Sequence, residues 1–583
     1  MNFLIKIYSQ KPVCTSVVLI VLLIFCAYAP SLANSFIWDD LLVVVHCDFI
    51  KSLQNLPLVF TQQYLTDPAT MTDMAKGGYG SGEISYRPVV TISYFIDYFF
   101  WKLNPFGYHL TNLILHALNG IIFYFLARFI LKSSPWALAA SLIFALHPAQ
   151  SEAVNNISFR EDLLVFLFYL ASFICFIELK KKDGRNRLFL ILVSQIFFML
   201  ALFSKEMAVT LPIVIVFYDY CFESKENFWQ RFRNIYAAYF ITAAFYLWVW
   251  KFLMPSAMEP FTFEGQSAYS NFLTMAKVFG LYVYWLFFPA HIHPTVPDWS
   301  LAEFSIFSFE VAASILLILL SLYYSGKAKK SSAVICFAAG WFFIALLPVA
   351  NIIPIQNIIA SRYLYIPSAG FSLFLAVYLM KTEQVSFKRI RKEFTQKAAR
   401  FAIAGLLLIY GLSSFAKSFV WKNGDTFFTE LALYYPHKDW IFWGLGKSFS
   451  QRGLLDEAVT AHRIASRLNP KDERNYDALG QIYLERGLLD QAIDAFRRTV
   501  QLNPHNQAAY MNLCAGLGER REWQESIDCF YNLLAYHPGS AGAYYNLGVV
   551  YSRSGEQKKA KEVWGKALSL DSKFKEAIEQ QEP

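Results

Sequence analysis

Residues 475–504, NYDALGQIYLERGLLDQAIDAFRRTVQLNP, decide the fold of the C-terminal part of this chain. The stretch is typical of two short helices packed as a pair. Gly480 and Ala492 are small enough to let the two helices approach closely, and Pro504 ends the second helix. A repeated helix pair is therefore predicted.

The same pattern recurs with a period of about 34 residues, which is the tetratricopeptide pattern. The positions in register are Pro470, Pro504 and Pro538; Gly446, Gly480 and Gly548; Gly453, Gly487 and Gly555; and Ala458, Ala492 and Ala560. Four repeats are predicted over about 439–572, after a half repeat from Asp425 to Pro436. Such an array presents a groove for a peptide or protein, although a packing or oligomerisation module is the alternative.

The rest of the chain has a different composition. Of the 583 residues, 56% are hydrophobic and 16% are charged, whereas a soluble protein has about 25% charged residues. The apolar excess lies between Val13 and about Phe419, in stretches separated by short charged loops. A membrane domain is predicted at 1–420, with an outer-face loop at 34–109, followed by a water-exposed domain at 421–583.

Spanning helices need about 20 mostly apolar residues. The strong candidates are 13–33, 110–131, 162–179, 187–204, 234–254, 306–325, 332–350, 362–380 and 400–419, and the weaker ones are 136–150 and 206–221. The predicted fold class is thus all-α, a polytopic membrane domain of about eleven transmembrane helices followed by a repeat solenoid. Segments 89–101 and 271–289 are also apolar, and we expect them to lie in the outer interface or to re-enter the membrane.

Clusters of Lys and Arg orient the spans. They lie at 180–187, 225–233, 327–330 and 388–400, and the positive-inside rule places all four in the cytoplasm. An odd number of spans then places the repeats on the outer side. Much of the net charge of +8 lies in such loops, so it does not indicate a nucleic-acid partner. The first span could instead be a signal peptide, because Ser31-Leu32-Ala33 resembles a cleavage site.

Polar residues at the outer ends of the predicted spans are candidates for chemistry, because charged groups are costly there. Asp39 and Asp40 follow the first span as adjacent carboxylates, which suit a base, a metal site or an acceptor clamp; a solvated loop pair is the alternative. The other candidates are Arg87, His109, His116, His147, Glu152, Arg160, Lys205, Glu206 and Arg362. Taken singly, His116 could bond a neighbouring helix, and Lys205 and Glu206 could form a structural ion pair. The predicted topology, however, sends every candidate to the same face.

The eight cysteines show no metal-ligand spacing. Cys514 and Cys529 fall within one predicted repeat, where they could meet. We expect them to be buried thiols.

With these residues in hand, the chain resembles the transmembrane and tetratricopeptide repeat-containing (TMTC) family of protein O-mannosyltransferases over nearly its full length. The matching segments are Phe36 to Asp40, Tyr86-Arg87-Pro88, Gly107 to His116, His147-Pro148, Glu152-Ala153-Val154, Arg160 to Leu163, Ser204-Lys205-Glu206, Tyr218-Asp219, Arg362 to Gly370 and the repeats. The resemblance implies a GT-C glycosyltransferase fold, an active site at the outer membrane face and a lipid-phosphate sugar donor. It also implies the endoplasmic reticulum membrane in a eukaryote; in a prokaryote we expect the inner membrane.

A polyprenyl-phosphate or dolichyl-phosphate sugar carries its own leaving group, so the chemistry needs cations for the phosphate and a base for the acceptor hydroxyl. Asp39 or Asp40 suits the base. Arg160, Lys205 and Arg362 suit the phosphate. A divalent metal remains open, and no other cofactor is expected.

The expected partners are membrane lipid, the lipid-linked sugar and an acceptor protein or peptide in the repeat groove. The predicted reaction transfers a sugar, with mannose favoured, to protein Ser or Thr hydroxyls on the extracytoplasmic or lumenal side. The alternatives are a glycan or lipid acceptor, and a membrane scaffold without catalytic activity.

Overall fold

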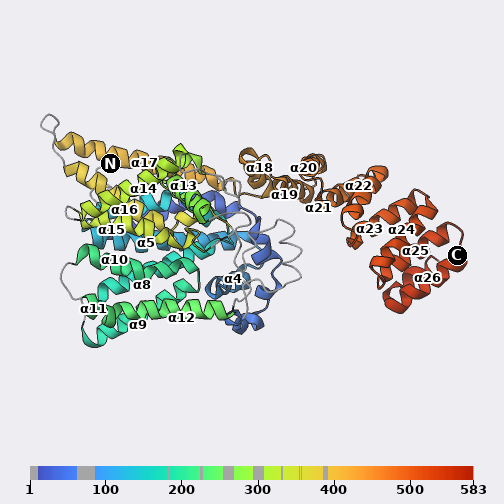
Figure 1. The fold of residues 1–583 in the computed structure, drawn as a ribbon, viewed down its shortest axis with the longest axis horizontal. Coiled ribbons are helices and arrows are strands. Elements are labelled where there is room, and N and C mark those ends of the chain that lie inside the picture. Colours follow the sequence, from blue (N-terminus) through green and yellow to red (C-terminus); the bar gives the residue numbers. More distant parts are fainter. Residues whose placement is uncertain are drawn as a thin grey trace. The chain divides into compact units, whose positions relative to one another are not determined.

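A computed structural model describes residues 11–61, 86–180, 183–223, 228–253, 268–292, 294, 308–329, 332–353, 355, 357–384 and 392–581. Residues 62–85 of the predicted outer loop, and parts of the basic clusters at 180–187, 225–233, 327–330 and 388–400, lie outside this set. Every regular element in the described ranges is a helix (Figure 1), so the predicted all-α class is confirmed. The chain forms two compact units, 1–426 and 427–583, whereas the sequence placed the boundary at 420/421.

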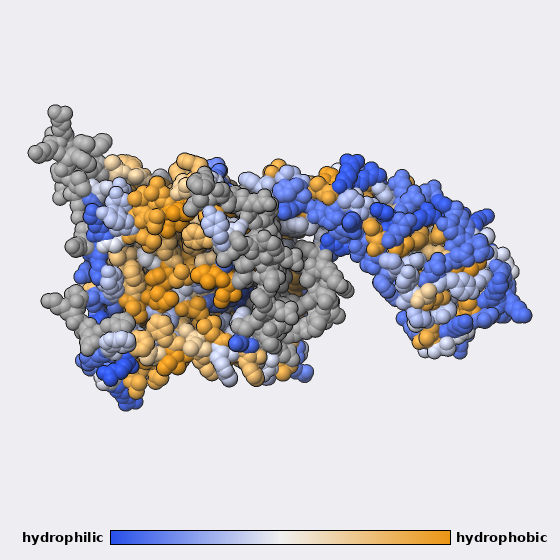
Figure 2. Space-filling view, in the orientation of Figure 1, coloured by the Kyte–Doolittle hydropathy of each residue, from blue (hydrophilic) through white to orange (hydrophobic). Residues whose placement is uncertain are grey.

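The first unit is a bundle of apolar helices. Its helices are α2 (Pro12–Tyr28), α4 (Pro88–Trp101), α5 (Pro105–Leu131), α6 (Ser134–Leu146), α7 (Ser151–Asn155), α8 (Arg160–Leu179), α9 (Gly184–Leu202), α10 (Leu211–Phe222), α11 (Phe228–Arg231), α12 (Ala237–Leu253), α13 (Ala268–Phe287), α14 (Phe309–Ala328), α15 (Ala333–Leu346), α16 (Pro367–Gln384) and α17 (Lys392–Ser418). The next helix, α18 (Gly424–Tyr434), crosses the boundary and lies mostly in the second unit. Figure 2 shows the hydrophobic surface gathered over this unit.

Seven helical stretches of the described residues are long and apolar enough to cross a membrane. They are Pro12–Ala33, Pro105–Leu131, Arg160–Leu179, Gly184–Leu202, Trp229–Phe252, Phe309–Ala328 and Gln396–Ser418. Ser134–Leu146 and Ala333–Val349 are shorter apolar helices. The predicted multi-pass membrane protein is therefore supported by helices at most of the predicted spans.

Local sequence explains where these helices begin. Pro12, Pro88 and Pro105 each occupy the first helical position, where a missing N–H costs nothing. Asn104 also caps α5, because its side chain accepts a hydrogen bond from Phe106 N at 3.2 Å. Pro88 fixes the first turn of α4 directly after Arg87, and Pro105 fixes the first turn of α5.

The ends of the first unit are tied to each other. The side chain of Asn34, just after α2, donates to Ser418 O at the end of α17, at 3.3 Å. Ser35 N donates to Lys422 O at 2.9 Å. These bonds hold the segment that carries Asp39 and Asp40 against the last helix of the unit.

The second unit is the predicted repeat solenoid. Its helices are α19 (Asp439–Gln451), α20 (Leu455–Leu468), α21 (Glu473–Glu485), α22 (Leu489–Leu502), α23 (Gln507–Glu519), α24 (Trp523–Tyr536), α25 (Ala541–Arg553), α26 (Gln557–Leu570) and α27 (Lys575–Glu579). Gly480 lies so close to its partner helix that a Cβ there would come within 2.6 Å of Phe496. The small residue of the repeat therefore sets the distance between the paired helices.

The turn inside each helix pair uses a left-handed backbone. Gly453, Gly487 and Gly555 have φ of +74°, +71° and +92°, as the repeat pattern requires. In the third repeat Arg521 occupies this position with φ of +64°. A Cβ placed at the three equivalent glycines meets no described atom within 4 Å, so a side chain has room at this turn, although the backbone conformation is strained for it.

Cys514 in α23 and Cys529 in α24 form a disulfide, with Cα atoms 5.4 Å apart. The prediction of two buried thiols was therefore wrong. The helices of a repeat pack closely enough to bring the two sulfur atoms into bonding distance.

Candidate functional site

The candidate site is organised by residues 147–162, which run from the end of α6 through the short helix α7 to the first turn of α8. Its main chain is held by side chains from neighbouring helices, because a non-helical buried backbone must find its hydrogen bonds elsewhere. Asn112 Nδ2 donates to Asn156 O at 3.1 Å, and Tyr94 OH donates to Ile157 O at 2.8 Å. This segment, the hub, receives every charged contact described below except the Arg87–Glu206 pair.

The two predicted catalytic carboxylates lie at the hub. Asp39 is 4% exposed and Asp40 is fully buried. Asp40 accepts hydrogen bonds from Ser158 N at 2.8 Å and from Ile37 N at 3.3 Å. Burial raises the pKa of Asp40 to about 8. A carboxylate with this pKa would be a stronger base than an exposed one.

The residue before this pair has an unusual backbone. Trp38 has φ of +48°, a left-handed conformation that is costly for a bulky side chain. Its indole packs edge-on against Phe159 of the hub, with ring centroids 6.1 Å apart. Strain of this kind persists where the surroundings fix it, which favours a functional position for Asp39 and Asp40.

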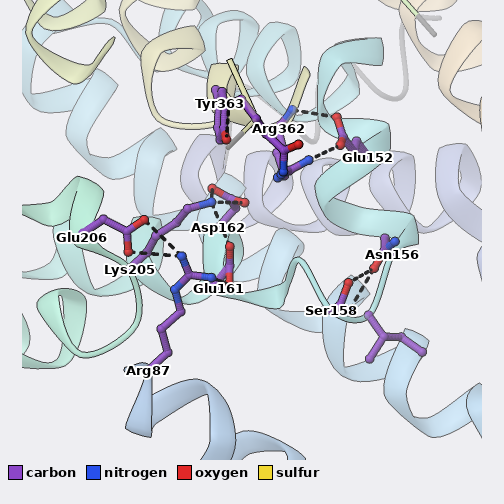
Figure 3. A network of polar contacts seen from close by, with 12 residues as sticks. Arg87, Glu152, Asn156, Ser158, Glu161, Asp162, Lys205, Glu206, Arg362 and Tyr363 are labelled. Atoms are coloured by element: carbon purple, nitrogen blue, oxygen red, sulfur yellow. Dashed lines mark hydrogen bonds and ion pairs between the residues drawn. The ribbon is translucent and has the colours of Figure 1, made fainter. Parts of the chain in front are cut away.

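Side chains of alternating charge form a row, the charge chain, in the order Glu206, Arg87, Glu161, Lys205 and Asp162 (Figure 3). Arg87 donates to Glu161 through one guanidinium nitrogen and to both oxygens of Glu206, at 3.1 and 3.2 Å, through another. Lys205 Nζ lies 3.0 Å from Glu161 Oε1 and 2.8 Å from each oxygen of Asp162. Lys205 and Glu206 are adjacent in sequence, yet they pair with different partners.

These carboxylates keep Lys205 charged. Burial alone would lower its pKa, but Asp162 and Glu161 raise it above the ordinary value. The lysine is only 3% exposed. A buried ammonium held in this way is a fixed positive charge beside the hub.

A second buried ion pair joins Arg362 to Glu152 of the hub. Arg362 Nη1 donates to Glu152 Oε1 at 2.6 Å, while Ser361 Oγ and Arg362 N donate to Oε2 at 2.6 and 3.0 Å. The guanidinium also lies 4.1 Å from the ring centroid of Phe159. The Tyr363 ring lies within 5.7 Å of Lys205 Nζ and 5.1 Å of Arg362 Cζ, which places the two cations near each other.

Arg160, at the start of α8, has a partner for each guanidinium nitrogen. They are Asn112 Oδ1 at 2.7 Å, Ser93 Oγ at 3.2 Å, Tyr108 O at 3.0 Å and Asp97 Oδ2 at 2.6 Å. The side chain is fully buried. A phosphate would have to displace one of these partners, so in this structure Arg160 joins α4, α5 and α8.

The three predicted histidines are buried within the helix bundle. His116 bonds Tyr365 OH at 2.7 Å and Ala145 O at 2.9 Å. His147 Nε2 bonds Leu286 O at 3.1 Å. His109, in the first turns of α5, is 1% exposed. The contacts of His116 and His147 link neighbouring helices.

Two charged partners, Asp97 and Asp162, were absent from the sequence candidates, whereas Glu161 was noted from the sequence as the neighbour of Arg160. The sequence did contain signals for these partners. One is an aspartate within the apolar stretch 88–101, and the other is the pair of carboxylates in the first turn of the apolar helix α8. No group of three or more His, Cys, Asp or Glu side chains in the described part of the chain could hold a metal ion. The carboxylates that line the hub instead pair with Arg and Lys or accept backbone N–H groups.

Together, fold and site define a multi-pass helical membrane protein with a buried charged site and a C-terminal tetratricopeptide array. Two family models, each described as Tetratricopeptide repeat, match residues 444–507 and 541–574. They confirm the predicted repeats.

Curated relatives cover both parts of the chain. It is 25% identical over 467 residues to "Protein O-mannosyl-transferase F38B6.6" of Caenorhabditis elegans, covering 77% of this chain and 62% of that protein. It is 24% identical over 470 residues to "Protein O-mannosyl-transferase tmtc2" of Xenopus laevis, covering 65% of this chain and 54% of that protein. It is 22% identical over 499 residues to "Protein O-mannosyl-transferase TMTC3" of Homo sapiens, covering 78% and 52%.

The resemblance to the TMTC family is therefore confirmed: the chain is homologous to these proteins over most of its length. It spans between 52% and 62% of the length of these three relatives. Among solved structures, the "Crystal structure of MamA" aligns with 26% of this chain and 87% of that chain, at 23% identity and a TM-score of 0.24.

Proposed function

We propose that this protein is a membrane glycosyltransferase that moves a sugar from a polyprenyl or dolichyl phosphate to Ser or Thr hydroxyls of proteins. Mannose is the favoured sugar, because the relatives are named protein O-mannosyl-transferases. The GT-C class is what the resemblance to the TMTC family implies. The observation that carries the proposal is the convergence of Asp40, Arg87, Lys205 and Arg362 on the hub. Asp39 precedes Asp40 in the sequence.

The proposed reaction is a single displacement. The acceptor oxygen bonds to the anomeric carbon of the sugar while the bond from that carbon to the phosphate oxygen breaks. The hydroxyl proton passes to Asp39 or Asp40, and the electron pair of the broken bond stays on the polyprenyl phosphate. Attack opposite the phosphate inverts the anomeric centre.

The cations suit the leaving phosphate. Arg87, Lys205 and Arg362 are less than a tenth exposed, where charges interact more strongly than in water. Arginine binds phosphate oxygens through paired N–H groups, and lysine acts as a point charge. We therefore assign phosphate binding to these three residues, with Arg160 positioning the helices around them.

An apolar groove in the first unit suits the lipid part of the donor. It has a volume of about 730 Å³ and lies between α13, α14, α15 and α16, with Phe287, Leu320, Phe342 and Phe371 in its lining. An isoprenoid chain would bury apolar surface there. Its contacts there are van der Waals packing, because bilayer lipid is as apolar as the groove.

Two observations support an extracytoplasmic or lumenal repeat array. The basic clusters of the membrane domain favour this orientation. The Cys514–Cys529 disulfide also belongs in an oxidising compartment. We infer that the array recruits the acceptor protein.

The test is transfer of labelled mannose from a polyprenyl-phosphate donor to acceptor protein by the purified chain in lipid nanodiscs. Transfer that requires Asp39 and Arg362 supports the enzyme. A chain that binds acceptor but neither transfers nor hydrolyses the donor would be a scaffold, and transfer to glycan or lipid would correct the acceptor.

A further inference from the structure

Glu206 differs in exposure from the other members of the charge chain. Its side chain is 48% exposed, whereas those of Arg87, Glu161, Lys205 and Asp162 are 7%, 5%, 3% and 0% exposed. In Figure 3 it stands at the end of the chain and meets it through Arg87 alone. Removing Glu206 from Arg87 therefore exposes less buried charge than removing any other member of the chain.

The charge balance of the chain also singles out this residue. Among the described side chains of the charge chain, two cations face three carboxylates when Glu206 is in place, and the formal charge is −1. Without Glu206, Arg87 and Lys205 face Glu161 and Asp162 alone, and the formal charge is zero. An incoming anion of charge −1 that replaces the Glu206 carboxylate therefore leaves the formal charge of the chain at −1, as it was before the exchange.

We propose that Glu206 is a displaceable anion, and that the phosphodiester of the lipid-linked sugar takes its place on Arg87. The inference rests on the proposed function. A guanidinium binds carboxylate and phosphate oxygens with the same paired geometry, so one anion can follow the other at the same nitrogen atoms.

The exchange distinguishes donor from product. A sugar linked to polyprenyl phosphate is a phosphodiester with one negative charge, equal to that of the displaced carboxylate. After transfer the lipid carries a phosphomonoester, whose second ionisation near pH 6 brings its charge close to −2. This charge exceeds that of the carboxylate it replaced. Return of Glu206 to Arg87 therefore favours release of the spent lipid.

The test compares binding of a short-chain isoprenyl phosphomannose by the wild-type chain, by Glu206→Gln and by Asp48→Asn. Asp48 is the matched control, because it is an exposed carboxylate paired with Lys51 at 2.7 Å. We expect Glu206→Gln to bind the phosphodiester roughly two- to fivefold more tightly, which is the worth of an exposed ion pair. Asp48→Asn should bind it as the wild type does.

A second measurement uses the unmodified protein, so it does not depend on the variant folding. Carbodiimide coupling of the Glu206 carboxylate, read by mass spectrometry, should increase when the isoprenyl phosphomannose binds. Inorganic phosphate and phosphatidylglycerol micelles are the comparison ligands, and neither should match the increase.

The outcomes separate the two proposals. Equal or weaker binding by Glu206→Gln, with coupling unchanged, overturns the displacement and leaves the proposed function standing. A wild-type chain that binds no isoprenyl phosphate overturns both. An equal increase with phosphatidylglycerol would make Arg87 a general lipid-headgroup site and overturn the donor assignment.

Discussion

Oδ1 of Asp40 accepts a hydrogen bond from Ser158 N at 2.8 Å, across 118 residues of sequence. This bond fixes the loop after α2 to the hub. It also gives Asp40 a structural task that an amide cannot fully perform.

Asp39→Asn should reduce sugar transfer by about 10²–10⁴ while donor binding persists, because the amide cannot accept the proton. Transfer and donor binding are measured on the same purified sample. Near-normal transfer by Asp39→Asn would exclude Asp39 as the base and leave Asp40 as the candidate.

Asp40→Asn should also lower thermal stability, by about 1–3 kcal/mol. Its NH₂ group would face one of the two backbone N–H donors that now bind the carboxylate. The measurement is thermal unfolding in detergent, with the wild-type chain as the comparison. An unfolding temperature of Asp40→Asn equal to that of the wild type would contradict the assigned bonding.

The raised pKa of Asp40 predicts opposite pH effects on stability and on rate. Burial moves this pKa from 3.8 to about 8, so the folded state binds more protons than the unfolded state between these values. The contribution of Asp40 to the free energy of unfolding is fully present below pH 3.8 and is lost as the pH rises towards 8. The unfolding temperature should therefore fall from about pH 5 to about pH 8, and less steeply in Asp40→Asn.

If Asp40 is the base, the rate of sugar transfer should rise between about pH 5 and about pH 8, because the carboxyl group loses its proton over this interval. A rate that falls with rising pH would exclude that role.

Glu152→Gln should destabilise the first unit by about 3–5 kcal/mol, because it leaves the guanidinium of Arg362 buried with a weakened partner. The control is Glu519→Gln, which removes an exposed partner of Arg553 and should cost less than about 1 kcal/mol. Thermal unfolding of both variants gives the comparison. Similar small losses in both would show that the Glu152 pair contributes little.

The repeat array should govern transfer to protein and leave donor chemistry in place. The structure sets the cut after Thr426 and not before Trp421, because Trp421 is buried and Lys422 O accepts from Ser35 N. The shortened chain should still hydrolyse the lipid-linked sugar, while transfer to protein falls roughly 10²-fold through loss of local acceptor concentration. Loss of both activities in a folded protein would place the array within the catalytic unit.

Replacing Cys514 and Cys529 by serine should lower the stability of the array by about 3 kcal/mol, since the disulfide closes a loop with a sequence separation of 15. Thermal unfolding of the full chain with and without reductant gives the value for the wild type. Reductant should not change the unfolding of the double variant.

The repeats of this protein could be predicted from its sequence, and the partners of its buried ion pairs could not. Glycine and proline recur at the positions equivalent to Gly480 and Pro504 because the helices of each repeat pack in the same way, so their spacing alone predicts the fold. The partners of Arg87 lie 74 and 119 residues away, and nothing in local sequence fixes which carboxylate an arginine meets. Membrane topology indicated the face on which Arg87, Glu152 and Arg362 lie, and only the packed bundle assigns Glu161 to Arg87 and Glu152 to Arg362.

The disulfide shows a second limit of prediction from sequence. The sequence placed Cys514 and Cys529 in one repeat, but helix spacing alone does not distinguish two neighbouring thiols from a bond. Asp97 was overlooked because it lies in a short apolar helix treated as a lipid-facing segment. Its ion pair with Arg160 shows that this face of α4 turns inward.

The bond between Asn34 and Ser418 spans 384 residues of chain. A ribosome adds about 5–20 residues per second, so the first helix enters the membrane on the order of 20–80 s before its closing partner exists. Throughout that interval the loop with both aspartates lacks its anchor on α17. Asp39 and Asp40 can therefore reach their final positions only after α17, the last predicted span, has been made.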